Sequence, residues 1–196
     1  MFHRTQNLFL RPPFPEDWRA VYQGIGEEEI VRNLATAPWP YEEKDAERWT
    51  ALPQDRVLPS FLIVLPDAGV IGSAGLSKDE ATGEVQLGYW VARAHWGKGY
   101  ASEAARGVLD VARMIGHNRV VASHFVDNPA SGRVLAKAGF QATGKTRLGY
   151  SLARDQHDEV ACFEVFLNAE ANGGDDGSDN ERGDGSHTMS QMQRAA

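Results

Sequence analysis

The sequence predicts an α/β fold, in which helices flank a mixed β-sheet and one long helix packs on the centre of that sheet. Three observations support this prediction. The chain has 196 residues, of which 42% are hydrophobic, and this is enough for one domain with its own core. Apolar residues recur at steps of three and four through 101–115, as in an amphipathic helix. β-rich runs precede this helix, and strands alternate with helices after it, as in a sheet covered by helices.

Before the long helix we expect one strand, three helical segments and three further strands. The first strand, 7–11, ends at a Pro-Pro pair, because proline has no N–H to donate to a sheet. The turn Pro66-Asp67-Ala68-Gly69 joins two later β-rich runs into a hairpin. The helical segments are expected from residue 15 onward and at 27–34 and 41–52, and the strands at 60–65, 70–76 and 84–91.

After the long helix we expect a strand, a helix and two closing strands. The apolar run 119–125 predicts a strand that is buried on both faces. Asn128 suits the N-cap of the next helix and Pro129 its first turn, while Gly139 suits its end. The closing strands are expected at 140–145 and 158–167.

The composition changes abruptly at Ala169. Residues 169–196 contain no Leu, Ile, Val, Phe, Tyr or Trp, and they carry six acidic residues against two arginines. A segment without large apolar side chains cannot offset the entropy lost on ordering. We therefore expect a folded domain over 1–168 and a disordered acidic tail over 169–196, which is either a partner-binding segment or a solvated terminus.

Composition and charge exclude several classes of function. The net charge of −7 argues against nucleic acid binding, which needs a basic surface. One cysteine, Cys162, cannot form an internal disulfide, and the six histidines lack metal-ligand spacing, so no metal is expected. No apolar run approaches the roughly 20 residues of a membrane helix, and the first residues lack the apolar segment of a secretory signal. We expect a cytoplasmic protein that does not bind membranes.

The loop Trp96-Gly97-Lys98-Gly99-Tyr100 joins a strand to the long helix. Its glycines allow a tight turn and a close backbone approach, and the helix start behind them offers free N–H groups. Together these features predict an anion site that suits a phosphate or pyrophosphate. The spacing fits neither a Walker loop nor a dinucleotide-binding fingerprint, in which Ser102 would have to be glycine or alanine. A plain glycine turn between strand and helix is the alternative.

Two motifs in this chain resemble one known family. The run GYWVARAHWGKGYASEAARGVL is similar to the acetyl-CoA-binding motif of the GNAT superfamily of N-acetyltransferases, above all its RimJ/RimL-like branch. The segment NPASGRVLAKAGF, residues 128–140, resembles the second half of the same signature. The resemblance covers about 5–168 and implies a GNAT-like fold with acetyl-CoA as co-substrate.

The resemblance also implies which residues bind acetyl-CoA. Backbone amides of the glycine loop would hold the pyrophosphate, and Lys98 could add a positive charge. Backbone groups at the end of the preceding strand would pair with the pantetheine arm, which Asn128 would also contact. Ser131 would lie near the thioester sulfur, although a polar first-turn residue is an equally good interpretation. The implied cofactor-binding residues are Trp90, Val91, Trp96, Gly97, Lys98, Gly99, Tyr100, Ala101, Asn128 and Ser131.

The catalytic residues follow less directly, because this chain departs from the family pattern twice. Leu135 stands where many members have a tyrosine that protonates the departing thiolate, so Ser131 or water would have to do this. Gln86 stands where the branch often has a glutamate. Glu84, on the same strand face, and His124 are the two candidate bases. A hydrogen-bonded structural role is the alternative for His124.

Two groups before the first hairpin have both functional and structural interpretations. Trp39, Tyr41 and Trp49 could line an acceptor pocket or belong to the core. The acidic run 27–29 could attract a cationic amine or complement a helix dipole.

The favoured function is transfer of acetyl from acetyl-CoA to a primary amine, either a protein N-terminus or a small-molecule amine. The alternative is a GNAT-fold acyl-CoA sensor or interaction module without turnover, which Leu135, Gln86 and the acidic tail suggest. A nucleotide-binding protein that uses the glycine loop is a third hypothesis. The resemblance is compatible with a homodimer.

Overall fold

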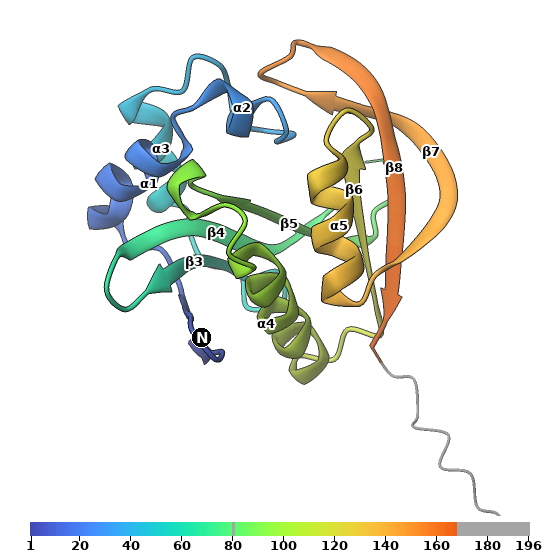
Figure 1. Cartoon of the computed structure of the whole chain (residues 1–196). Coiled ribbons are helices and arrows are strands. Elements are labelled where there is room, and N and C mark those ends of the chain that lie inside the picture. The colour runs from blue at the N-terminus through green and yellow to red at the C-terminus, as the bar shows by residue number, and fades with distance from the viewer. Residues whose placement is uncertain (80, 168–196) are drawn as a thin grey trace, which may run out of the picture.

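The computed structural model describes residues 1–79 and 81–167, so the predicted tail lies outside the described residues. Helices and strands follow one another along the chain much as expected (Figure 1). The helices are α1 (Trp18–Ile25), α2 (Glu28–Val31), α3 (Glu43–Thr50), α4 (Tyr100–Met114) and α5 (Pro129–Ala138). The strands are β1 (His3–Arg4), β2 (Phe9–Arg11), β3 (Ser60–Leu65), β4 (Gly69–Lys78), β5 (Val85–Val91), β6 (Arg119–Phe125), β7 (Gln141–Ser151) and β8 (Gln156–Phe166).

All of these strands belong to one mixed sheet. Its order is β1-β2-β3-β4-β5-β6-β8-β7, and every neighbouring pair is antiparallel except β5 and β6, which are parallel. Helix α4 supplies the crossover between these two parallel strands. The predicted mixed sheet flanked by helices is confirmed.

The two faces of the sheet carry separate cores, because successive strand residues point to opposite faces. Ile63 and Val91 lie in the larger core, which includes the apolar side of α4. Leu62 and Trp90, their neighbours in sequence, lie in the smaller core with residues of α1, α2 and α3. Figure 1 shows α4 and α5 side by side in front of the sheet.

Strands β5 and β6 share a single register pair, Gln86 with Val121. By contrast, β4 and β5 pair through seven consecutive residues. Beyond Gln86, β5 therefore runs away from β6 with its backbone edge unpaired on that side. The opening widens toward the carboxyl ends of both strands, where the glycine loop and Asn128 follow.

Strands β6 and β7 differ from their predictions. Val120 and Ala122 of β6 are buried, but Val121 and Ser123 on the other face are only half-buried. β7 extends to Ser151, with a register irregularity between Ala142 and Thr146. Residues 146–151 show no apolar alternation that would predict a strand. They are strand because they pair with β8.

Candidate active site

The glycine loop enters the site from the open end of β5. After Val91 the chain makes a short 3-10 helix, Arg93–His95, and then turns at two glycines with positive φ, Gly97 (+74°) and Gly99 (+85°). Gly99 is the N-cap of α4, whose first helical hydrogen bond runs from the N–H of Glu103 to the carbonyl of Gly99, at 3.0 Å. The amides of residues 100–102 lie ahead of this bond, so they are available to an anion.

Side chains within the loop hold its shape. The Trp96 indole N–H donates to the carbonyl of Val91 at 2.6 Å, which connects the loop to the end of β5. The Lys98 ammonium donates to the carbonyl of Ala94 at 3.1 Å, and its side chain is exposed. The Nδ1 atom of His95 is buried without a hydrogen-bond partner among the described residues. These polar groups, the glycines and the helix N-terminus fit a phosphate-bearing ligand.

Asn128 and Ser131 lie on the other side of the opening, at the start of α5. The side-chain oxygen of Asn128 accepts from the Ser131 N–H at 3.3 Å, so the predicted N-cap is confirmed. The Ser131 Oγ lies 2.6 Å from the hydroxyl of Tyr89, which projects from β5. Burial raises the pKa of Tyr89 to about 12, although its hydrogen bond with Ser131 opposes this shift.

Sequence reasoning missed Tyr89. The available signal was its alternation with Leu87 and Val91, which places all three side chains on the face that α4 and α5 cover. The structure brings Tyr89 and Ser131 together with the two predicted pantetheine-binding residues, Trp90 and Val91, which end the same strand.

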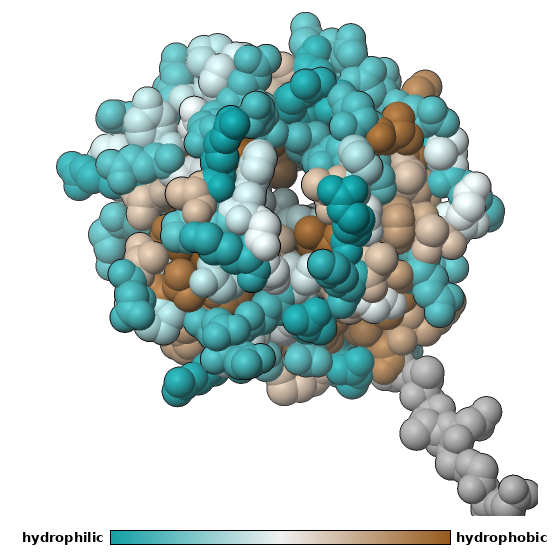
Figure 2. Space-filling model, viewed as in Figure 1, coloured by the Kyte–Doolittle hydropathy of each residue, from teal (hydrophilic) through white to brown (hydrophobic). Residues whose placement is uncertain are grey.

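Open space lies over the middle of β5. A Cβ added at Gly88 would meet no atom within 4 Å, and this residue is exposed although it lies inside the sheet. Figure 2 shows a hollow near the centre of this face, where Figure 1 draws β5 between α1 and α5. The free edge of β5 and this space together fit a narrow, extended ligand.

The two candidate bases lie in different places. Glu84 precedes β5 and pairs with Arg119, at the end of the strand opposite the glycine loop. Six residues of strand separate it from Trp90, or about 20 Å. The structure therefore does not bring Glu84 together with Ser131. His124 ends near α5: its Nδ1 contacts the carbonyl of Phe125 at 2.8 Å, and its Nε2 faces Gly132.

The two family positions that are altered in this chain also differ in setting. Leu135 is 1% exposed and belongs to the larger core, so it is part of the packing beneath α5. Gln86 forms the single register pair where β5 and β6 begin to diverge.

A second group of residues gathers around Arg154, at the carboxyl end of β6. Arg154, between β7 and β8, has a side chain only 8% exposed, and its guanidinium lies over the ring of Phe125 at 4.1 Å. It donates to both oxygens of Asp127, at 2.9 and 3.0 Å, to Asp158 at 2.9 Å and to the carbonyl of Arg32 at 2.7 Å. The bond from Arg154 holds the pKa of Asp127 below its usual range, against a smaller effect of burial.

The same loop binds the segment that follows α2. The Ser151 hydroxyl contacts the carbonyls of Arg32 and Leu34, and the Leu152 N–H donates to the carbonyl of Ala35 at 2.9 Å. Figure 1 shows the tip of the β7–β8 hairpin reaching toward α2. Residues more than 100 positions apart in sequence thus form one wall of the site.

The structure also places the three aromatic residues and the acidic run for which the sequence left two interpretations. Tyr41 is buried in the smaller core and Trp49 packs against it, whereas Trp39 is exposed. Glu27 and Glu29 both pair with Arg93, which connects the start of α2 to the chain just after β5. The acidic run is therefore partly neutralised.

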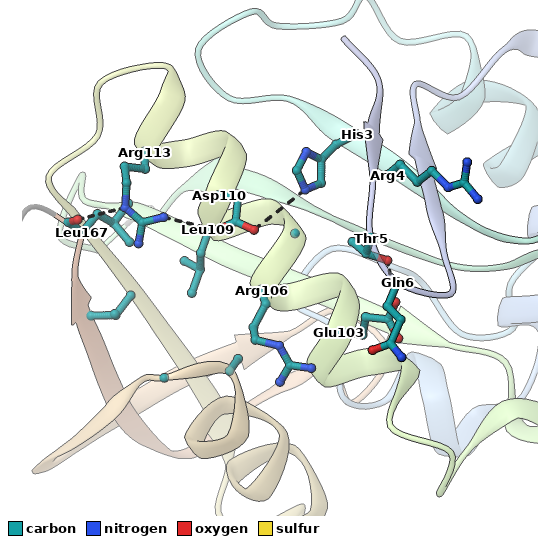
Figure 3. A pocket seen from close by; sticks show the side chains of 14 residues that line it. His3, Arg4, Thr5, Gln6, Glu103, Arg106, Leu109, Asp110, Arg113 and Leu167 are labelled. Atoms are coloured by element: carbon teal, nitrogen blue, oxygen red, sulfur yellow. Dashed lines mark hydrogen bonds and ion pairs between the residues drawn. The ribbon is translucent and has the colours of Figure 1, made fainter.

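A separate hollow of about 550 Å³ lies along the outer side of α4 (Figure 3). Several of its polar groups are already paired. Glu103 accepts from Thr5 and Asn7, Arg113 donates to Asp110 and to the carbonyl of Leu167, and Arg106 donates to the carbonyl of Lys137. Glu103, which belongs to the glycine-loop motif, thus holds the N-terminal segment against α4.

Neither a helix long and apolar enough to cross a membrane nor a group of side chains suited to hold a metal ion occurs in residues 1–79 and 81–167.

Comparisons with known proteins agree with this geometry. The model of the acetyltransferase (GNAT) domain family matches residues 7–141. A relative named "uncharacterized N-acetyltransferase p20", from Bacillus licheniformis, is 28% identical over 169 residues, which cover 83% of this chain and 94% of that protein.

Two solved structures share the fold. One is a GNAT-family acetyltransferase from Bacillus anthracis, with a TM-score of 0.73 and 19% identity over 85% of this chain and 99% of that one. The other is RimL, a ribosomal α-N-protein acetyltransferase in complex with coenzyme A, with a TM-score of 0.71 and 18% identity over 87% of this chain and 100% of that one. The chain has the predicted GNAT fold and belongs to the GNAT family of acetyltransferases.

Proposed function

We propose that this protein transfers acetyl from acetyl-CoA directly to a primary amine, and that residues 1–168 form the catalytic unit. One observation carries the proposal. The unpaired edge of β5 leads from Tyr89 and Ser131 to two glycines with positive φ and the free amides of α4. An extended thiol arm that ends in a pyrophosphate matches this arrangement in both shape and charge.

The binding residues divide into two groups. The amides of 97–101 bind the pyrophosphate at the N-terminus of α4, with Trp96 holding the loop in place and Lys98 nearby. The backbone of Trp90 and Val91 pairs with the pantetheine arm in the manner of an added strand, and Asn128 contacts the same arm.

Few side chains are needed for the transfer itself. Bound acetyl-CoA supplies an acetyl group that is already activated as a thioester. The protein positions it, excludes water and directs polar groups at the charge that develops. Ser131 is the hydroxyl for the departing sulfur, because Leu135 is buried and has no proton to donate. His124 stands closer to Ser131 in sequence and structure than Glu84 does, and it is the candidate that can accept the amine proton.

The acceptor is an N-terminal or small-molecule amine, as in the RimJ/RimL-like branch. The wall formed by α2 and the β7–β8 loop supports this proposal. Asp127 lies between two arginines with its carboxylate partly exposed, so this wall presents paired charges to the acceptor. Arg32 and Arg154 both pair with Asp127. The wall therefore selects among acceptor amines by the arrangement of its charges as well as by its shape.

The test has two stages, both with the full chain. Acetyl-CoA is first titrated into the protein by calorimetry, with ATP and NAD as competitors. Saturable binding at one site, unaffected by either nucleotide, is expected. Release of CoA thiol is then followed with peptides, polyamines and aminoglycosides as acceptors, and acceptor-dependent release is the expected result. Absence of acetyl-CoA binding by the folded protein would overturn the proposal.

The second candidate is an acyl-CoA sensor, and the altered positions Gln86 and Leu135 favour it. It predicts tight CoA binding with no acceptor-dependent release of thiol. Steady turnover with any of the amines would remove this candidate.

A further inference from the structure

The contact between Tyr89 and Ser131 joins the two sides of the opening. Tyr89 comes from β5 and Ser131 from the first turn of α5, and their hydroxyl oxygens lie 2.6 Å apart. This distance is at the short end for a hydrogen bond between hydroxyls. Tyr89 packs against the larger core and is largely removed from solvent. Water therefore screens this hydrogen bond poorly, which strengthens it.

The direction of this hydrogen bond determines what Ser131 can do. The Tyr89 hydroxyl has one proton, and it lies near two acceptors, the Ser131 Oγ at 2.6 Å and the Ser131 carbonyl at 3.2 Å. The carbonyl lies inside α5, where helical geometry already provides it with a donor. A carbonyl oxygen has two lone pairs and can still accept, so it is the shorter distance, 2.6 Å against 3.2 Å, that favours donation to Ser131 Oγ. The serine's own proton then has to point elsewhere, because it cannot be donated back to Tyr89.

We propose that Tyr89 is a positioning residue, whose hydroxyl donates to Ser131 Oγ and thereby directs the serine proton at the sulfur of the bound thioester. This inference rests on the proposed function. As the amine nitrogen bonds to the acetyl carbon, the carbon–sulfur bond breaks and its electron pair stays on sulfur. Ser131 stabilises that thiolate by a hydrogen bond, without giving up its proton. The attacking amine loses one proton, which His124 accepts.

Tyr89 can act in this way because it stays neutral. Its pKa of about 12 keeps the phenol protonated throughout the physiological range, whereas a phenolate would draw the serine proton toward itself. His124, on β6, is the titratable side chain that faces this part of α5, at Gly132. Arg133, next to Ser131, is exposed.

The test measures binding of CoA itself and does not require turnover. A site that hydrogen-bonds a thiolate binds CoA more tightly once the thiol ionises, near pH 8.5 for an ordinary thiol. CoA is titrated into the full chain by calorimetry at pH 7.5 and pH 9.5, a range above that in which histidine usually titrates. Acetyl-CoA, which has no thiol proton, is the matched control ligand, and each affinity is expressed relative to it.

We expect the relative affinity for CoA to rise about fivefold over this range in the wild type. Tyr89→Phe and Ser131→Ala should each reduce the rise to less than twofold. Tyr150→Phe is the matched control, because it removes an exposed phenol hydroxyl that donates to Asp155 at 3.0 Å and is not bonded to Ser131, and it should keep the full rise. In turnover, Tyr89→Phe should lower kcat about tenfold, leave KM for acetyl-CoA within twofold, and have no further effect when Ser131→Ala is present.

The outcomes separate this inference from the proposed function. Failure of the folded wild type to bind either ligand would overturn both. Binding without a rise in relative affinity, or a rise that persists in Tyr89→Phe, would overturn the role of Tyr89 alone. A larger rise in Tyr89→Phe would mean that the serine donates to the tyrosine, and this would also overturn it.

Discussion

The two sides of the opening are built differently. Most of the proposed cofactor side is one continuous stretch of chain, 85–101, which holds the end of β5, the glycine loop and the start of α4, and Asn128 and Ser131 of α5 complete it. The proposed acceptor side is assembled from the segment after α2, Asp127 and the β7–β8 loop, where Arg154 contacts Arg32, Asp127 and Asp158. The first acts mainly through backbone groups, and the second through side chains that are distant in sequence.

This difference predicts that the cofactor side is general and the acceptor side specific. Backbone amides at a helix N-terminus can serve any protein that binds the same pyrophosphate, so their sequence pattern recurs. A wall of paired charges depends on several separate loops, each of which can vary independently. Changes on the cofactor side should therefore affect ligand binding, and changes on the acceptor side should affect stability and the choice of amine.

The largest effect is expected at Gly99. Gly99→Glu places a side chain at φ +85° and a negative charge at the N-terminus of α4, so acetyl-CoA affinity should fall by about 100-fold or more. Gly83→Glu is the matched control, since its φ is +71° and its Cβ would also meet no atom within 4 Å. Calorimetry and circular dichroism on both variants check this prediction, and equal losses of affinity would contradict it.

The acceptor side should respond to Arg154→Ala with a loss of stability. The variant removes a nearly buried guanidinium and leaves Asp127 and Asp158 without their shared partner, so unfolding free energy should fall by about 2 kcal/mol. Urea unfolding measures this, while acetyl-CoA affinity should stay within twofold. Arg32→Ala, which removes an exposed pair with the same Asp127, should cost less than about 1 kcal/mol. A large loss of acetyl-CoA affinity in Arg154→Ala would mean that the two sides are not separate.

Glu103 tests whether a residue of the glycine-loop motif can be structural. Hydrogen bonds from Asn7 and Thr5 outweigh the effect of burial, and they lower the pKa of this carboxyl. Its contribution to stability is therefore present above the unfolded pKa, near 4.3, and is lost as pH falls through the lower folded value. Glu103→Gln should cost about 1 kcal/mol at pH 7, and this difference should shrink toward pH 3.

The free energies of unfolding of the wild type and of Glu103→Gln, measured at pH 7 and toward pH 3, check this prediction. Glu47→Gln, at an exposed position of α3, is the control and should change little at either pH. A deficit in Glu103→Gln that stays constant with pH would exclude a role for the carboxylate charge.

Lys98 should give the smallest effect. Its ammonium contacts the carbonyl of Ala94 and is exposed, so Lys98→Met should weaken acetyl-CoA binding no more than about threefold. The residual difference should disappear in high salt, because exposed charges are screened. A loss comparable with that of Gly99→Glu would show that the lysine charge, rather than the backbone, dominates the loop.

The parts of the molecule that the sequence predicts are those encoded locally. The boundaries of α4, the caps Asn128 and Gly139, and the hairpin of β3 and β4 all follow from short patterns. The extension of β7 could not be predicted, because its residues 146–151 are held in the sheet by pairing with β8 rather than by any apolar alternation.

The candidate site shows the same division. The glycine loop and Ser131 follow from motifs, whereas Tyr89 acts through a partner 42 residues away, and Arg154 contacts Asp127 and Arg32, which lie 27 and 122 residues away. Glu84, expected on a face of this strand, instead precedes β5 and pairs with Arg119 at the end opposite the glycine loop. Spacing along one strand predicts a face, but not which end of that strand is active.

The unpaired edge of β5 has one more consequence. Free strand edges at the margin of a sheet invite other polypeptides and promote aggregation. This edge lies in mid-sheet, with β6 beside it and α5 held against it through the contact of Tyr89 with Ser131. A foreign β-sheet cannot enter such a gap, whereas a single slender chain can. The molecule thus keeps backbone hydrogen-bonding groups of β5 available to a ligand, while the narrow gap between β5 and β6 limits the ligand to a slender chain.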